Sequence, residues 1–160
     1  MSTTNSRRGV ADPTATDLTA TDPTATTVWF AMNGLVRDRA RESRARITEV
    51  IDIPFSRFRA LRRVAERPMT QRELAEGMGV DKSAMSGIVD DLVERGLVTR
   101  EPEPSDRRCR LVTITDAGRR VVTEVIDNPA VAPSMFDALD GAELRQLAGL
   151  LDKLRRAAES

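Results

Sequence analysis

The sequence predicts a mainly α-helical protein that carries one small β-hairpin. Apolar residues recur at three- and four-residue steps in several segments between residues 27 and 158, which is the spacing that lines one face of a helix. Residues 97–115 differ, because two short runs, the second rich in β-branched residues, flank a turn that contains two prolines. The 160 residues are enough for one ordinary domain.

Composition narrows the functional classes. The chain has 25 basic and 25 acidic residues, so only the local distribution of charge is informative. Residues 27–67 hold ten of the basic and five of the acidic residues. Histidine is absent and Cys109 is the single cysteine, which excludes an intrachain disulfide framework and a cysteine-based zinc site and removes the commonest general base. We expect no cofactor, no metal and no enzymatic activity.

The first residues are expected to form a tail. Residues 12–26 consist of three tandem pentads, DPTAT, DLTAT and DPTAT, which cannot bury enough apolar surface to offset the entropy of ordering them. We predict a disordered tail over residues 1–26; alternatively, Arg7 and Arg8 make it an arm that orders on contact. No apolar run reaches about 18 residues and no secretory signal is recognisable, so we expect a cytoplasmic protein without a membrane segment.

Two helices follow the tail. A long helix is predicted over residues 27–52, with an apolar stripe on one side and several arginines between the apolar positions. Pro54 marks a break, and a shorter stripe follows, formed by Phe55, Phe58, Leu61 and Val64.

The next segment predicts a helix, a turn and a second helix. Thr70 precedes Glu73 by three residues, the spacing of a capping box, and Gly77 and Gly79 suit a tight turn. The second helix is expected to begin after Asp81 as N-cap and to stop at a left-handed Gly96. Its outer face carries small or hydroxyl-bearing residues in the N-terminal half, which suits entry into a DNA groove about 12 Å wide. An ordinary surface helix is the alternative.

A hairpin placed directly after such a pair of helices is a wing. The expected strands are residues 97–101 and 109–115, and residues 102–106 form the turn. Arginines at its tip are suited to the narrow minor groove, where the negative potential is strongest. Asp106 is placed to brace one of them through a bidentate pair; an exposed turn ion pair is the alternative.

Residues 58–118 resemble the winged-helix core of the MarR family of bacterial transcription regulators. The resemblance rests on four motifs, which are LAEGMGVDKS, LVERGLV, SDRR and ITDAG. It implies a winged helix-turn-helix domain at residues 53–118, flanked by an N-terminal dimerisation helix at 27–52 and C-terminal dimerisation helices at 119–160.

The resemblance also implies a function: a homodimeric regulator, typically a repressor, bound to a near-palindromic operator in double-stranded DNA. The second helix enters the major groove and the wing enters the minor groove. The positions that match DNA-contacting positions of the family are Thr70, Gln71, Lys82, Ser83, Ala84, Ser86, Gly87, Asp106, Arg107 and Arg108. Gly87 departs from the basic or larger polar residue that many relatives have there. Because Gly87 offers no side chain to the bases and Asp90 and Asp91 are negatively charged, we expect sequence preference to depend more on the wing and on DNA shape.

An apolar stripe near the C-terminus points to pairing of two chains. A lone short helix cannot bury this stripe against itself, so partner helices are its expected cover, although packing within one subunit is the alternative. The residues assigned to dimerisation are Trp29, Met32, Leu144, Leu147, Leu151 and Leu154. Pro129 and Pro133 predict a break between about 127 and 134 in what is often one long helix of the family.

Relatives commonly bind small aromatic or phenolic anions between the dimerisation helices and the winged helix, and the ligand weakens DNA binding. The residues suited to such a cleft here are Trp29, Phe30, Arg37 and Phe55, with packing of the aromatic rings in the core as the alternative. Two further alternatives remain open. One is a thiol-responsive regulator that uses Cys109 beside Arg108 and Arg110; the other is a dimeric winged-helix module that binds protein and has weak or no affinity for DNA.

Overall fold

The computed structural model describes residues 22–102 and 110–158. The chain divides into two compact units, residues 1–40 and 41–160, so the boundary falls within the first helix, α1 (Ala25–Val50). This helix begins two residues before the predicted start, after Thr24, whose hydroxyl accepts a hydrogen bond from the Thr27 amide at 3.2 Å. Residues 1–21 of the predicted tail lie outside the described residues.

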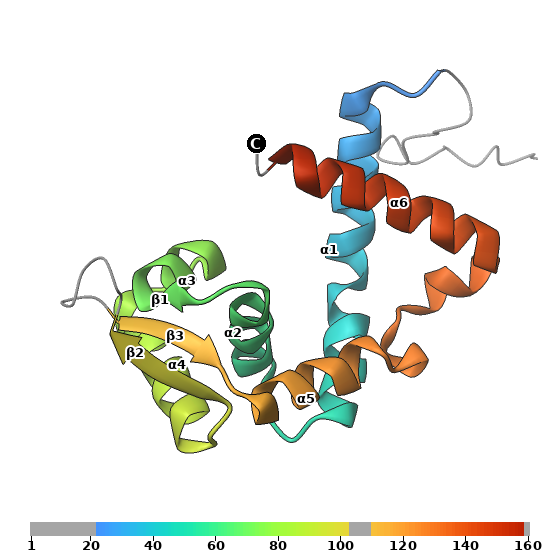
Figure 1. Cartoon of the computed structure of the whole chain (residues 1–160). Helices are drawn as coiled ribbons and strands as arrows, with labels where there is room; N and C mark the ends of the chain where they lie inside the picture. Colours follow the sequence, from blue (N-terminus) through green and yellow to red (C-terminus); the bar gives the residue numbers. More distant parts are fainter. Residues whose placement is uncertain (1–21, 103–109, 159–160) are drawn as a thin grey trace, which may run out of the picture. The chain divides into compact units, whose positions relative to one another are not determined.

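The second unit contains the predicted helix pair and hairpin (Figure 1). The sheet is antiparallel with the order β1-β3-β2, and Val98 of β2 lies opposite Ile114 of β3. A mainly α-helical fold with a small sheet is thus confirmed. The elements are α2 (Phe55–Glu66), β1 (Met69–Thr70), α3 (Gln71–Met78), α4 (Lys82–Glu94), β2 (Val98–Pro102) and β3 (Arg110–Ile114).

The core of this unit is built around α2, which contacts α3, α4, β3 and the following helix, α5 (Asp116–Ile126). Side chains from each of these elements, and from β2, interlock there and exclude water, which is the main source of their stability. The largest side chains with almost no exposed surface are Leu61, Val64, Leu74, Met85, Val89, Leu92, Val98 and Val112.

The predicted break in the C-terminal region is confirmed. After α5 come two short 3₁₀ helices, η1 (Pro129–Val131) and η2 (Ser134–Ala138), and then α6 (Gly141–Ala158). Proline cannot donate a backbone hydrogen bond, so the helix ends before Pro129, and the Asn128 side chain caps η1. Arg46 Nη1 donates to the carbonyls of Ala130 and Ala132, each at 3.0 Å, which ties this segment to the C-terminal part of α1.

Two details of the predicted turns were wrong. Gly77 lies inside α3 rather than in the turn, which is formed at the left-handed Gly79. At Gly77 the Arg63 guanidinium occupies the space that a side chain would need, and its Nη2 donates to the Gly77 carbonyl at 2.6 Å. Pro102 is the last residue of β2 and pairs with Arg110, which is permitted because β2 is an edge strand.

Within the described residues, every helix is too short or too polar to cross a membrane.

Candidate nucleic-acid interface

The start of α3 is fixed by the predicted capping box. The Glu73 amide donates to the Thr70 hydroxyl at 3.2 Å, and the Thr70 amide donates to Glu73 Oε2 at 2.7 Å. The Thr70 hydroxyl also donates to Glu73 Oε2, at 2.9 Å. The two hydrogen bonds that the Thr70 amide and hydroxyl donate to this carboxylate, with a smaller contribution from Arg67, hold the pKa of Glu73 below its usual range. The box therefore holds Thr70 and Gln71 in place at the amino end of α3.

The start of α4 is fixed in the same manner. Asp81 is the N-cap, and its Oδ1 accepts from the Ala84 amide at 2.8 Å. Met85 and Val89 are fully buried and orient the helix on the core. The opposite side, at Ser83, Ala84 and Gly87, is exposed. This is the low-bulk face that the sequence predicts.

A basic hollow of about 360 Å³ lies between the amino ends of α3 and α4 and the base of the hairpin. Two of its cations come from the strands and two from the helices. Arg72 pairs with Glu76 and Arg100 with Asp90, so the net positive charge of the hollow rests mainly on Lys82 and Arg110. Such a concave basic surface attracts phosphate groups. Its lining residues are Thr70, Gln71, Arg72, Lys82, Arg100, Arg110 and Val112.

Sequence reasoning assigned Thr70, Gln71 and Lys82 to the interface but missed Arg100. Arg100 lies two residues after buried Val98 on β2, and alternate residues of a strand lie on the same face. Its side chain therefore extends from the inward face of the strand toward the helices. The sequence signal that could have identified Arg100 is a basic residue at a strand position that otherwise faces the apolar core. The predicted wing-tip residues Asp106, Arg107 and Arg108, and Cys109 with them, lie outside the described residues.

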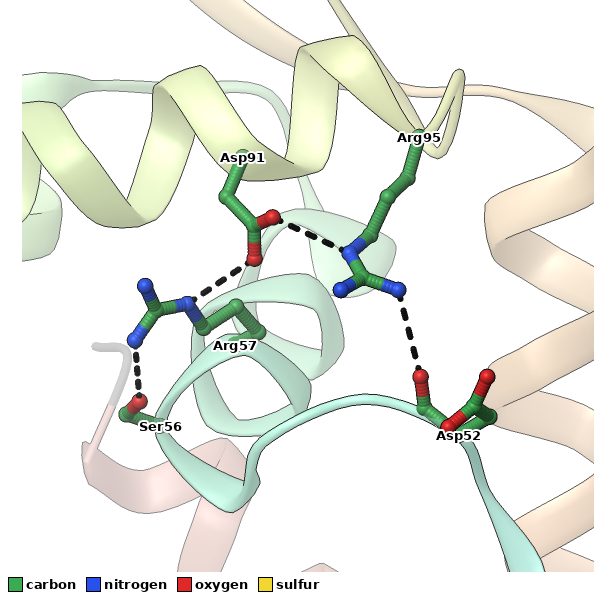
Figure 2. A network of polar contacts seen from close by, with 5 residues as sticks. All are labelled: Asp52, Ser56, Arg57, Asp91 and Arg95. Carbon is green, nitrogen blue, oxygen red and sulfur yellow. Dashed lines mark hydrogen bonds and ion pairs between the residues drawn. The ribbon is translucent and has the colours of Figure 1, made fainter.

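Two of the three acidic residues of α4, Asp90 and Asp91, are compensated by arginines. Asp90 pairs with Arg100. Asp91 accepts through Oδ2 from Arg57 Nε and through Oδ1 from Arg95 Nε, each at 3.0 Å (Figure 2). Hydrogen bonds from Arg95 first, and also from Arg57, lower the pKa of Asp91 below its usual value. The carboxylates of Asp90 and Asp91 therefore both have a positively charged partner.

Arg95 extends this network to the segment before α2, because its Nη1 donates to the Asp52 carbonyl at 3.2 Å (Figure 2). Arg57 also donates to the Ser56 hydroxyl. The carboxyl-terminal half of α4 is thus connected to the amino end of α2 and to the turn that precedes it.

The aromatic residues assigned to a ligand cleft lie in different surroundings. Trp29 and Phe30 are 62% and 65% exposed on α1, so neither ring is buried within the single chain. Arg37 is exposed on the same helix, beside Asp38. Phe55 packs against the edge of the core, and the Arg44 guanidinium lies 5.0 Å from the centre of its ring.

Two hollows flank the side of α2 that carries Phe58. The first, about 320 Å³, is lined by Phe55, Arg59 and Arg63, among others, and the second, about 390 Å³, by α5 and the segment that contains η1 and η2. They share four lining residues, Ser43, Ile47, Phe58 and Arg62. Basic and aromatic side chains therefore meet in one continuous region.

The predicted dimerisation stripe on α6 is solvent-accessible. Leu144, Leu151 and Leu154 are exposed, Leu147 is half-buried, and no residue of α6 in the described range is buried. Packing of the stripe within its own subunit therefore leaves 40–57% of the surface of Leu144, Leu151 and Leu154 in water. On α1, Trp29 is exposed and Met32 half-buried.

A search of protein families matches residues 51–108 to the MarR family. An uncharacterised helix-turn-helix transcriptional regulator of Bacillus subtilis, YpoP, is 32% identical over 133 residues, covering 81% of this chain and 94% of that protein. The chain belongs to the MarR family. It has the winged-helix fold of DNA-binding transcriptional regulators in that family.

Solved structures agree with this MarR assignment. Wild-type MarR of E. coli in its apo form superposes with a TM-score of 0.61 at 25% identity, over 76% of this chain and 95% of that chain. CouR of Rhodococcus jostii RHA1, solved with bound p-coumaroyl-CoA, superposes with a TM-score of 0.58 at 25% identity, over 84% of this chain and 95% of CouR.

Proposed function

We propose that this MarR-family protein is a homodimeric repressor that binds a near-palindromic operator and is released from it by a small anionic ligand. The observation that carries the proposal is the low-bulk, exposed face of α4 next to the hollow that contains Arg72, Lys82, Arg100 and Arg110. The protein acts by binding and not by catalysis. In this proposal residues 53–118 bind DNA, and residues 27–52 and 119–160 pair the subunits.

The N-terminal half of α4 is the part that fits the major groove. Ser83, Ala84 and Gly87 have side chains short enough for the helix backbone to approach the base edges closely. Lys82 at the first turn and Arg110 on β3 line one hollow beside it, and in this proposal they contact phosphates there. The wing-tip arginines, Arg107 and Arg108, extend the contact into the minor groove, as the family resemblance implies.

Pairing of two chains is supported by the exposed apolar residues of α6. Leu150, Leu151 and Leu154 are exposed by 54%, 44% and 57%, and a second copy of the chain would remove this area from water. A dimer also matches the symmetry of a near-palindromic operator, because each subunit then contacts one half-site.

The ligand class follows from the two hollows beside Phe58. Arg59 and Arg62 provide positive charge that exceeds the single negative charge of Glu66, and Phe55, Phe58 and Ile47 provide apolar surface. This combination suits an anion with an aromatic body, and CouR, a relative solved with p-coumaroyl-CoA, holds a ligand of that kind. The segment with η1 and η2 lines the second hollow, so a ligand there contacts both α2 and the connection to α6.

Fluorescence anisotropy tests DNA binding. A labelled duplex from the promoter next to the gene is titrated at two salt concentrations. Neutralisation of phosphates makes log K fall by about 0.9 per contact for each log unit of salt. A steep fall supports the repressor. Absence of binding, or a response that does not depend on salt, contradicts it and favours a winged-helix module that binds protein.

A further inference from the structure

Three side chains from α4 and β2 form a chain of hydrogen bonds on the groove-facing side. The Ser86 hydroxyl donates to Asp90 Oδ2 at 3.4 Å, one helical turn along α4. The other oxygen, Asp90 Oδ1, accepts from Arg100 Nη2 of β2. Each carboxylate oxygen of Asp90 thus has a partner, and the two partners lie on different elements.

The chemistry of these groups determines which of them donates and which accepts in each hydrogen bond. A carboxylate that pairs with a guanidinium is ionised, so it accepts hydrogen bonds and donates none. A serine hydroxyl has a single proton and two lone pairs. When that proton points at Asp90, only the lone pairs of Ser86 remain for another partner.

Ser86 is half-buried at the edge of the exposed face formed by Ser83 and Gly87, which the proposed function places against base pairs. In the major groove adenine and cytosine present a donor, their exocyclic amino groups, and adenine also presents the acceptor N7, whereas guanine and thymine present hydrogen-bond acceptors and no donor. A serine with a freely rotating hydroxyl serves either kind of edge, but a serine that can only accept discriminates between them.

We propose that Asp90 is a specificity-determining residue: it holds Ser86 as a hydrogen-bond acceptor, so that the helix selects the amino group of adenine or cytosine at one position of each half-site. The inference rests on the proposed function, because it assumes that α4 enters the major groove. Arg100 compensates the charge of Asp90, whose side chain is 59% exposed, and so allows a carboxylate to lie close to the phosphates.

The roles of the three side chains are separable. Loss of Ser86 removes the acceptor, so affinity falls for preferred sites only. Loss of Asp90 releases the hydroxyl proton, so affinity rises for sites with guanine or thymine at that position. Loss of Arg100 leaves the hydrogen bond between Ser86 and Asp90 intact but exposes a bare carboxylate, so affinity falls for all sites equally.

The test is selection from a library of random duplexes with the full-length protein, followed by titration of the selected sites. The wild type is expected to favour adenine or cytosine at one position in each half-site by about fivefold, the value of one hydrogen bond. Ser86→Ala loses about fivefold on those sites and nothing on the others. Asp90→Ala gains about fivefold on guanine and thymine sites, so the preference vanishes, and Arg100→Gln weakens all sites and keeps the preference.

Glu94→Ala, one turn further along the same face, is the control and leaves the preference unchanged. Circular dichroism checks that each variant is folded. If the wild type enriches no sequence and binds no duplex, the proposed function and this inference fail together. If it binds a selected operator and Asp90→Ala keeps the preference of the wild type, the inference alone is overturned and the proposed function stands.

Discussion

Arg57 Nε of α2 lies 3.0 Å from Asp91 Oδ2 of α4, one helical turn beyond Gly87 on the same side of the helix. Since Arg95 Nε donates to the other oxygen of the same carboxylate, Asp91 connects α4 to α2 and, through the bond from Arg95 to the Asp52 carbonyl, to the turn before α2. These ion pairs thus hold the carboxyl-terminal half of α4 in place, whereas its N-terminal half stays exposed, as the proposed contact with DNA requires.

Asp91→Asn is expected to lower the free energy of unfolding by about 1 kcal/mol. The Asp91 side chain is only 25% exposed, and its replacement leaves two arginines without their shared anion. Glu76→Gln is the matched control, because Glu76 pairs with Arg72 on an exposed helix surface and such pairs contribute little. Urea denaturation of both variants at one protein concentration measures the difference. Equal losses would show that the Asp91 network contributes no more than an exposed pair.

The capping box predicts a pH dependence. The pKa of Glu73 is lowered from 4.5 in the folded protein, so the ionised form is favoured by folding. Its contribution is therefore fully present above the unfolded value and is lost as pH falls through the lower, folded pKa. The difference in unfolding free energy between the wild type and Glu73→Gln should be constant from pH 7 to about 5 and shrink at more acid pH. A difference that grows on acidification would contradict this sign.

Gly118→Ala is expected to destabilise the protein by about 2 kcal/mol or more. A Cβ at this position would lie 2.2 Å from the Leu97 carbonyl oxygen and 2.8 Å from Ile114, so α5 must separate from the sheet. Gly87→Ala is the counterpart: nothing lies within 4 Å of its Cβ, and the change should stabilise α4 by about 0.5–1 kcal/mol. The melting temperatures of the two variants, measured by thermal unfolding, are compared with that of the wild type. Similar melting temperatures would refute the close approach at Gly118.

Lys82→Ala and Arg110→Ala should each weaken binding to all DNA sequences and reduce the slope of log K against log salt by about 1. Both side chains line the basic hollow, where they are placed to contact phosphates. Lys153→Ala, on α6, removes the same charge elsewhere and should leave the slope unchanged. A slope that responds to Lys153 as much as to Lys82 would mean that net charge, and not the hollow, determines affinity.

The sequence predicted the helices well because their signals are local. The capping box at Thr70, the N-cap at Asp81 and the left-handed Gly96 lie at the predicted positions. Each depends on hydrogen bonds or dihedral preferences within one turn of the chain. The hairpin was predicted for the same reason, from β-branched residues on either side of a turn.

What the sequence did not reveal depends on contacts distant along the chain. The two-residue strand β1 has no pattern of its own and exists because it pairs with β3. Gly77 resembles a turn residue, but its place inside α3 is explained by Arg63 of α2, fourteen positions earlier. Arg100 joins the candidate site only because the sheet brings β2 beside α4. Similarly, the arginine partners of Asp90 and Asp91 lie on β2 and α2, distant along the chain, so the sequence pattern does not reveal that these two negative charges are compensated.

A hydroxyl-radical footprint on the promoter next to the gene tests the central claim most directly. If two subunits each insert α4 into a major groove, two protected half-sites will appear with centres about one helical turn apart, and Lys82→Ala will weaken both equally. A single protected segment, or no protection at concentrations that saturate nonspecific binding, would contradict the account.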